Sequence, residues 1–97
     1  MATIRDRVVM EIGKNAYSLG RIVYAYNDSC SNTGADLGPV ETLLPKTRSY
    51  AVENHLVFKP KSDINDRYWI TEEDLPKLIE GMDWAINLED LIDKAEL

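Results

Sequence analysis

Residues 3–26 read TIRDRVVMEIGKNAYSLGRIVYAY, and this stretch decides how the N-terminal part of the chain folds. Its apolar side chains recur at steps of three and four residues, which is the period of one face of an α-helix. They are Ile4, Val8, Ile12, Ala16, Leu19, Val23 and Tyr26. The spacing therefore predicts one amphipathic helix over residues 4–26.

Several residues of this stretch favour or oppose the predicted helix. Thr3 and Asp6 have the spacing of a capping box, with Asp in place of the more usual Glu, and they mark its start. Gly13 and Gly20 oppose it, because a glycine inside a helix costs about 1 kcal/mol relative to alanine. Two β-branched pairs in the stretch also suit strands. A strand–turn–strand arrangement is therefore the alternative.

Turn-forming residues fill the segment 27–49, which includes the step Gly38-Pro39 and a further proline at Pro45. The residue before a proline is biased away from the helical conformation. We therefore expect a long loop here, with at most one helical turn at 40–44.

The next segment, residues 50–58, places most of its large apolar side chains on one side of an extended chain, as the period of a β-strand requires. The short run 67–70 is also apolar and aromatic, and the polar residues 59–66 between the two suit a turn. We expect these two runs to form a short antiparallel strand pair.

The C-terminal part begins with a strong helix start. Thr71 offers a capping hydroxyl, and the three carboxylates that follow it are favoured by the positive end of a helix dipole. Pro76 is tolerated only in a first turn, so the helix begins close to it, with Asp74 as the alternative cap. Asn87 has the character of a second cap. Residues 75–96 are thus predicted to form one broken helix or two helices.

The order of these elements predicts an α+β fold: an N-terminal amphipathic helix, a long loop, a short antiparallel strand pair and one or two acidic C-terminal helices. A small all-α bundle is the alternative. The length of 97 residues corresponds to a single small domain over 1–97. Hydrophobic residues make up 44% of the chain, which is enough for a modest core without disulfides or metal.

The composition also bears on the compartment. The single Cys excludes an intramolecular disulfide, and one Cys with one His is too few for a structural zinc site. No apolar run approaches the roughly 18 residues of a membrane span, and the first residues lack the apolar core of a secretory signal. We therefore expect a cytoplasmic protein that does not associate with membranes.

Motifs of known catalytic or cofactor-binding chemistry are missing: there is no P-loop, dinucleotide fingerprint, HExxH zinc motif or GxSxG elbow. Cys30 and His55 have no third group to orient them, so we interpret Cys30 as a packing residue and His55 as an ordinary strand residue. Asp63, Asn65 and Asp66 lack the glycine and the closing Glu of a calcium loop, which favours a solvated turn. We expect no enzyme activity, no cofactor and no metal.

The charge is unevenly distributed along the chain. Its 11 basic and 17 acidic residues give a net charge of −6, which argues against a general nucleic-acid binder. Residues 1–61 hold eight basic and six acidic residues, for a net +2, whereas 62–97 hold three basic and eleven acidic residues, for a net −8. The acidity therefore belongs to the last third.

This acidic segment carries the leading functional hypothesis, a non-catalytic protein-binding module of the inhibitor, immunity or antitoxin type. Its C-terminal helical segment would dock on a basic surface of a larger protein. Like charges three or four residues apart destabilise an isolated helix, so an acidic face fits a basic partner as well as solubility. The candidate partner-binding residues are Glu72, Glu73, Glu80, Asp83, Glu89, Asp90 and Asp93.

The alternative hypothesis is a small anionic-ligand binder, for a nucleotide or short RNA, in the strand region. Pairing of the two predicted strands would bring cations and aromatic rings together, and such a cluster can hold a phosphate and stack a base. The candidate residues are Lys46, Arg48, Tyr50, Lys59, Lys61, Tyr68 and Trp69.

The first predicted helix also has an unusually wide apolar stripe. Tyr17, Tyr24 and Tyr26 extend it beyond what a strand pair and a final helix can cover. A homodimer that buries this helix is therefore a further expectation.

Overall fold

The computed structural model describes residues 3–32, 40–82 and 87–96. These residues form five helices and one two-stranded antiparallel sheet, which confirms the α+β class. In chain order the elements are α1 (Ile4–Ile12), β1 (Ala16–Ser18), α2 (Leu19–Asn32), α3 (Val40–Glu53), β2 (Trp69–Thr71), α4 (Leu75–Gly81) and α5 (Leu88–Glu96).

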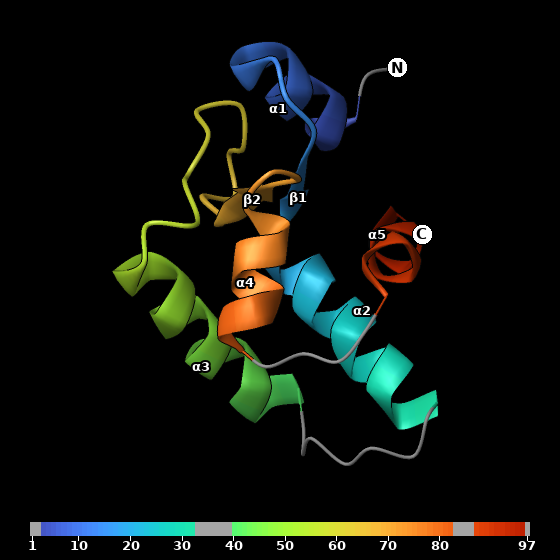
Figure 1. Ribbon diagram of the computed structural model, residues 1–97. Helices are drawn as coiled ribbons and strands as arrows, with labels where there is room; N and C mark the ends of the chain where they lie inside the picture. The colour runs from blue at the N-terminus through green and yellow to red at the C-terminus, as the bar shows by residue number, and fades with distance from the viewer. Residues whose placement is uncertain (1–2, 33–39, 83–86, 97) are drawn as a thin grey trace.

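Figure 1 shows α1 at one end of the molecule, with the two strands next to it and α2, α3 and α4 leading away from the strands. Helix α2 contacts β1, α3 and α5, so it is the central element. It also supplies a large share of the buried side chains. These are Leu19, Ile22, Val23, Ala25 and Tyr26.

The single helix predicted over residues 4–26 is wrong, because the chain turns at Gly13. This residue has a left-handed φ of 71°, and its N–H donates to the Val9 carbonyl at 2.7 Å, which ends α1. The chain then extends, and β1 pairs with β2 so that Tyr17 lies opposite Ile70. All three residues of β1 are buried. A strand buried on both faces does not show the alternation by which strands are recognised.

The helix starts predicted at Thr3 and Asn87 agree with the structure. The capping box is confirmed: the Asp6 N–H donates to Thr3 Oγ1 at 3.1 Å, and the Thr3 N–H donates to Asp6 Oδ2 at 3.0 Å. At the start of α5, Asn87 Oδ1 accepts the Glu89 N–H at 2.8 Å. Asp74 precedes α4 without a side-chain cap. The C-terminal part thus contains two helices, and the segment between them lies outside the described residues.

The long loop predicted over 27–49 is wrong for most of its length. Helix α2 continues to Asn32, and α3 begins at Val40 and runs through Pro45, while residues 33–39 lie outside the described part. An interior proline costs a helix about 3 kcal/mol, and burial of one face of α3 offsets this cost. The buried residues of that face are Leu43, Thr47 and Ala51.

The strand predicted over 50–58 is also wrong. Residues 50–53 belong to α3, and in the described chain only Phe58 pairs with the second predicted strand, through two backbone hydrogen bonds of 2.8 and 2.9 Å with Trp69. The strand that pairs with β2 over its full length is β1. Alternation over so few residues also fits the last turn of a half-buried helix, so the pattern did not distinguish the two.

The core has a large and a small part. The large cluster joins α2 to α3, α4 and α5. The small cluster attaches α1 to the sheet through Val8, Ala16 and Trp69, with Ile4, Ile12 and Phe58 packed against it.

Candidate functional site

Glu72 and Glu73, which were predicted to bind a partner, make bonds to other residues of the chain. Glu73 Oε2 lies 2.8 Å from Lys14 Nζ, and Glu72 Oε2 accepts a hydrogen bond from Asn15 Nδ2 at 3.2 Å. The backbone N–H of Glu72 also donates to the Asn15 carbonyl at 3.0 Å. These two residues therefore fasten the end of β2 to the turn after α1, although both side chains are exposed.

Four other predicted carboxylates are exposed, and in the described part of the chain their side chains make no ion pair or hydrogen bond. They are Glu80 on α4 and Glu89, Asp90 and Asp93 on α5. Several acidic side chains elsewhere are paired: Asp28, Asp66 and Asp74 each lie within 3.2 to 3.6 Å of a lysine. The remaining predicted residue, Asp83, lies outside the described residues.

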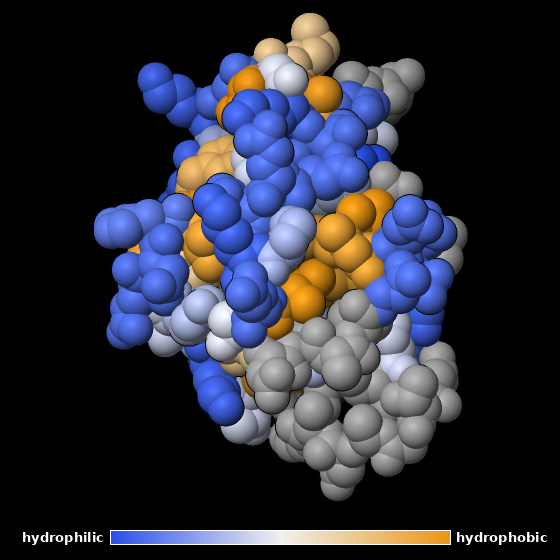
Figure 2. All heavy atoms as spheres, viewed as in Figure 1, coloured by the Kyte–Doolittle hydropathy of each residue, from blue (hydrophilic) through white to orange (hydrophobic). Residues whose placement is uncertain are grey.

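Half-buried apolar side chains accompany these four carboxylates on the same two helices. They are Ile79 and Met82 at the end of α4 and Leu88 and Ile92 on α5. Figure 2 shows apolar atoms gathered between α4 and α5, with hydrophilic side chains to the left and right of them. We call these eight residues the α4–α5 face. A partly exposed apolar centre within a charged border is the usual anatomy of a protein–protein interface.

The predicted basic and aromatic residues do not form one site, because the strand pairing that would unite them is reduced, in the described chain, to the single Phe58–Trp69 bridge. Lys46, Arg48 and Tyr50 lie on α3, whereas Lys59, Lys61, Tyr68 and Trp69 lie before or within β2. Lys59 does meet an aromatic ring, with its Nζ 4.8 Å from the centre of the Tyr68 ring, but it also lies 3.2 Å from Asp66 Oδ2.

Trp69 is only 4% exposed, so its ring is not available for stacking on a base. Its indole N–H donates to Asp63 Oδ2 at 2.7 Å, and Arg67 Nε donates to the same oxygen at 2.9 Å. Burial raises the pKa of Asp63, but hydrogen bonds from Arg67, Trp69 and a backbone N–H outweigh it and lower the pKa to about 2. Asp63 is therefore a buried, ionised anchor.

The interpretation of residues 63–66 as a solvated turn is thus wrong for Asp63 and right for the exposed Asn65 and Asp66. In the described ranges, no group of three or more His, Cys, Asp or Glu residues could hold a metal ion. His55 lies exposed in the turn after α3, with φ at 55°, and not in a strand. The side chain of Cys30 lies outside the described part.

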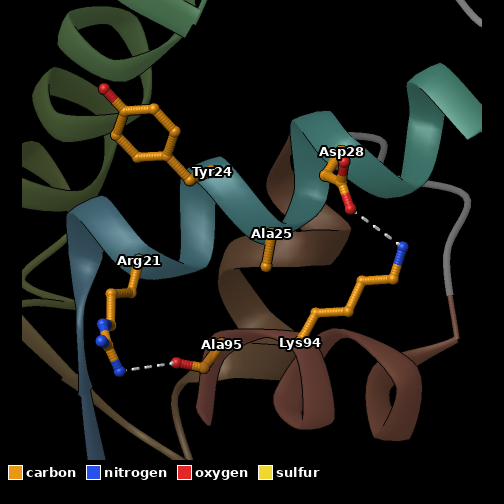
Figure 3. A pocket seen from close by; sticks show the side chains of 6 residues that line it. All are labelled: Arg21, Tyr24, Ala25, Asp28, Lys94 and Ala95. Carbon is orange, nitrogen blue, oxygen red and sulfur yellow. Dashed lines mark hydrogen bonds and ion pairs between the residues drawn. The ribbon is translucent and has the colours of Figure 1, made fainter. Parts of the chain in front are cut away.

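A shallow groove of about 460 Å³ runs between α2 and α5 (Figure 3). Two bridges cross it: Arg21 Nη1 donates to the Ala95 carbonyl at 3.3 Å, and Lys94 Nζ lies 3.3 Å from Asp28 Oδ2. Between them Ala25 points toward α5 and leaves the hollow unfilled. Both bridges join α2 to α5, so we interpret the groove as part of the packing between these two helices and not as a binding site.

A second cavity, of about 490 Å³, lies where α1, β1, the first turn of α2 and the end of α5 converge. Its lining includes three arginines, Arg5, Arg21 and Arg67. The sequence hypotheses did not select them, because they are widely separated along the chain and no local motif joins them. The pairing of β1 with β2 brings Arg67 close to the other two.

Comparison of the chain with protein-family models, with curated proteins and with solved structures found no match. Among the described residues, no helix is long and apolar enough to cross a membrane.

Proposed function

We propose that this protein is a non-catalytic binding module, of the inhibitor, immunity or antitoxin kind, that docks its α4–α5 face on a basic surface of a larger protein. The observation that carries the proposal is a set of four exposed carboxylates, without a partner among the described residues, beside half-buried apolar side chains. The apolar centre supplies contact area, and the carboxylates supply steering and partner choice.

The charge arrangement has a cost that a partner would relieve. Asp93 lies four residues after Glu89 and three after Asp90, so all three share one side of α5. Like charges at these spacings destabilise a helix by a few tenths of a kcal/mol each. Glu89 and Asp90 are favoured in the first turn by the helix dipole, but Asp93 lies beyond that turn. Lysines or arginines on a partner would offset the repulsion.

Neither of the other two binding expectations has a comparable observation in its favour. The homodimer rested on a continuous helix over residues 4–26, and the chain breaks that helix at Gly13. Tyr17 and Tyr26 are buried within the chain itself, and Tyr24 is 57% exposed. The nucleotide site in the strand region rested on residues that lie on separate elements.

The experiment that tests the proposal uses the whole chain as bait in an extract of its native host, with mass spectrometry of the captured proteins. The variant Glu89→Lys/Asp93→Lys reverses two charges on the α4–α5 face. The variant Glu41→Lys/Glu53→Lys makes the same charge change at exposed positions of α3 and is the matched control. A partner captured by the wild type and the control, and lost with the α5 variant, supports the proposal. Equal capture by all three contradicts it.

A further inference from the structure

The cavity of about 490 Å³ next to α1 has a lining in which cations predominate. Arg5 comes from α1, Arg21 from the first turn of α2, and Arg67 from just before β2. Among the described residues of the lining, Asp6 is the only acidic one, and its Oδ2 already accepts the Thr3 N–H. We propose that this cavity is a binding site for a small phosphomonoester, separate from the α4–α5 face.

Partners within the fold hold each of the three guanidinium groups. Arg67 Nε donates to Asp63 Oδ2 at 2.9 Å, and this carboxylate is itself held by the Trp69 indole. Arg21 donates to the Ala95 carbonyl at 3.3 Å, and Arg5 lies 4.7 Å above the centre of the Tyr17 ring. Groups that are already oriented lose little entropy when a ligand binds.

The arginines that are held still have hydrogen-bond donors to offer. A guanidinium carries five N–H groups. In the described chain Arg67 uses its Nε and Nη2 for Asp63, and Arg21 uses one Nη1 N–H for Ala95. The planar fork of arginine matches the oxygens of a phosphate group, which accept several such donors at once.

The position of α5 bears on the charge of the ligand. A helix C-terminus carries a partial negative charge, which opposes an anion, but the carbonyl of Ala95 in the last turn accepts the Arg21 N–H. Of the charged side chains that the structure describes at the cavity, Asp63 and Asp6 balance two of the three arginine charges, which leaves a formal charge of +1. A ligand with one or two negative charges fits this surplus.

The aromatic residues limit what the rest of the ligand can be. Tyr17 is 3% exposed and Trp69 is 4% exposed, so neither ring offers a free face to a base. Arg5 covers the Tyr17 ring, and Arg67 lies 5.4 Å from the centre of the Trp69 ring. Recognition therefore rests on the phosphate group, together with polar atoms such as the Ser18 hydroxyl, and not on base stacking.

The test is a calorimetric titration of the whole protein with glucose 6-phosphate, with glucose as the uncharged control. We expect saturable binding of glucose 6-phosphate with a Kd of about 1 mM or lower, and no binding of glucose. The variant Arg21→Gln is expected to weaken binding about tenfold. The variant Arg48→Gln removes an exposed arginine of α3 and should leave the Kd unchanged.

A spectroscopic readout on the wild type covers the case in which Arg21→Gln does not fold. Amide and indole resonances of Tyr17, Ser18 and Trp69 should shift together as glucose 6-phosphate is added, because these residues line the cavity. The proposal is overturned by an absence of saturable binding, by equal binding to a folded Arg21→Gln variant, or by shifts confined to other parts of the chain.

Discussion

The indole N–H of Trp69 donates to the buried Asp63 Oδ2 at 2.7 Å, and this bond joins the loop before β2 to the small core cluster that holds α1 on the sheet. Asp63 is 5% exposed and also pairs with Arg67. A buried carboxylate stabilises a fold only when such partners replace its water. The attachment of α1 thus depends on a polar group as well as on apolar packing.

The first prediction concerns the stability that this carboxylate supplies. The folded pKa of Asp63 is about 2, below the ordinary value of 3.8, so its charge stabilises the fold above about pH 4 and ceases to do so as the pH falls to about 2. A shift of this size corresponds to about 2.5 kcal/mol. Urea unfolding should show Asp63→Asn less stable than the wild type by about 2 kcal/mol at pH 7. The gap should narrow as the pH falls below about 4.

A matched control is Asp66→Asn, because Asp66 lies in the same loop and its side chain is 76% exposed. Its effect on the free energy of unfolding should be below about 0.5 kcal/mol. If the gap between the wild type and Asp63→Asn stayed constant down to about pH 2.5, the ionised anchor would be the wrong description.

The second prediction uses Gly13 and Gly20. At both positions an added Cβ would have no neighbouring atom of another described part of the chain within 4 Å. Gly13 has a φ of 71°, so Gly13→Ala should destabilise the protein by about 1 kcal/mol. Gly20 lies in α2 without a left-handed φ, so Gly20→Ala should stabilise it by about 0.5 to 1 kcal/mol. Thermal unfolding measures both. Effects of the same sign would contradict a helix break at Gly13.

The third prediction tests how α4 packs on α3. An added Cβ at Gly81 would overlap the phenol ring of Tyr50, including its hydroxyl oxygen and the ring carbon that bears it. Gly81→Ala should therefore destabilise the fold by about 1 to 3 kcal/mol. Tyr50→Ala removes the obstacle, so Gly81→Ala should cost much less in that background. Denaturant unfolding of the four proteins gives the coupling, and purely additive effects would rule out the contact.

The fourth prediction concerns the attachment of the loop before β2 to α1. The Glu11 carboxylate accepts three hydrogen bonds, from the Lys61 N–H, the Ser62 N–H and the Ser62 hydroxyl, at 2.6 to 3.1 Å. These bonds lower the pKa of Glu11. In Glu11→Ala, hydrogen exchange of the Lys61 and Ser62 amides should accelerate about tenfold. Exchange of core amides such as Ile22 should change far less, and an unaltered rate at both loop amides would disprove the attachment.

The fold shows which sequence signals were sufficient to predict a structural element. Capping at Thr3 and Asn87 was predictable, because the interaction is made within three residues of the cap. The sheet was not, because the partner of β2 lies more than 50 residues away and β1 is only three residues long. Helix α3 was missed because Pro45 and nearby turn formers outweighed its apolar positions, and tertiary burial then decided the outcome.

The features of the candidate sites also differ in whether the sequence alone could predict them. Exposure of the carboxylates on α5 was predictable, since the helical period places the buried Leu91 opposite Glu89 and Asp93. Engagement of Glu73 by Lys14 was not, because it needs the pairing of β1 with β2. The arginine-lined cavity was missed for the same reason, as it is made by residues from separate elements.

The central proposal is that the α4–α5 face binds a basic protein surface, and it is tested most directly by the association rate with the captured partner. At low salt, Glu89→Lys/Asp93→Lys should associate at least about tenfold more slowly than the wild type, and the difference should shrink at about 0.5 M salt. Glu41→Lys/Glu53→Lys should match the wild type within about twofold. Association rates that are equal for the wild type and the α5 variant at low salt would contradict the proposal.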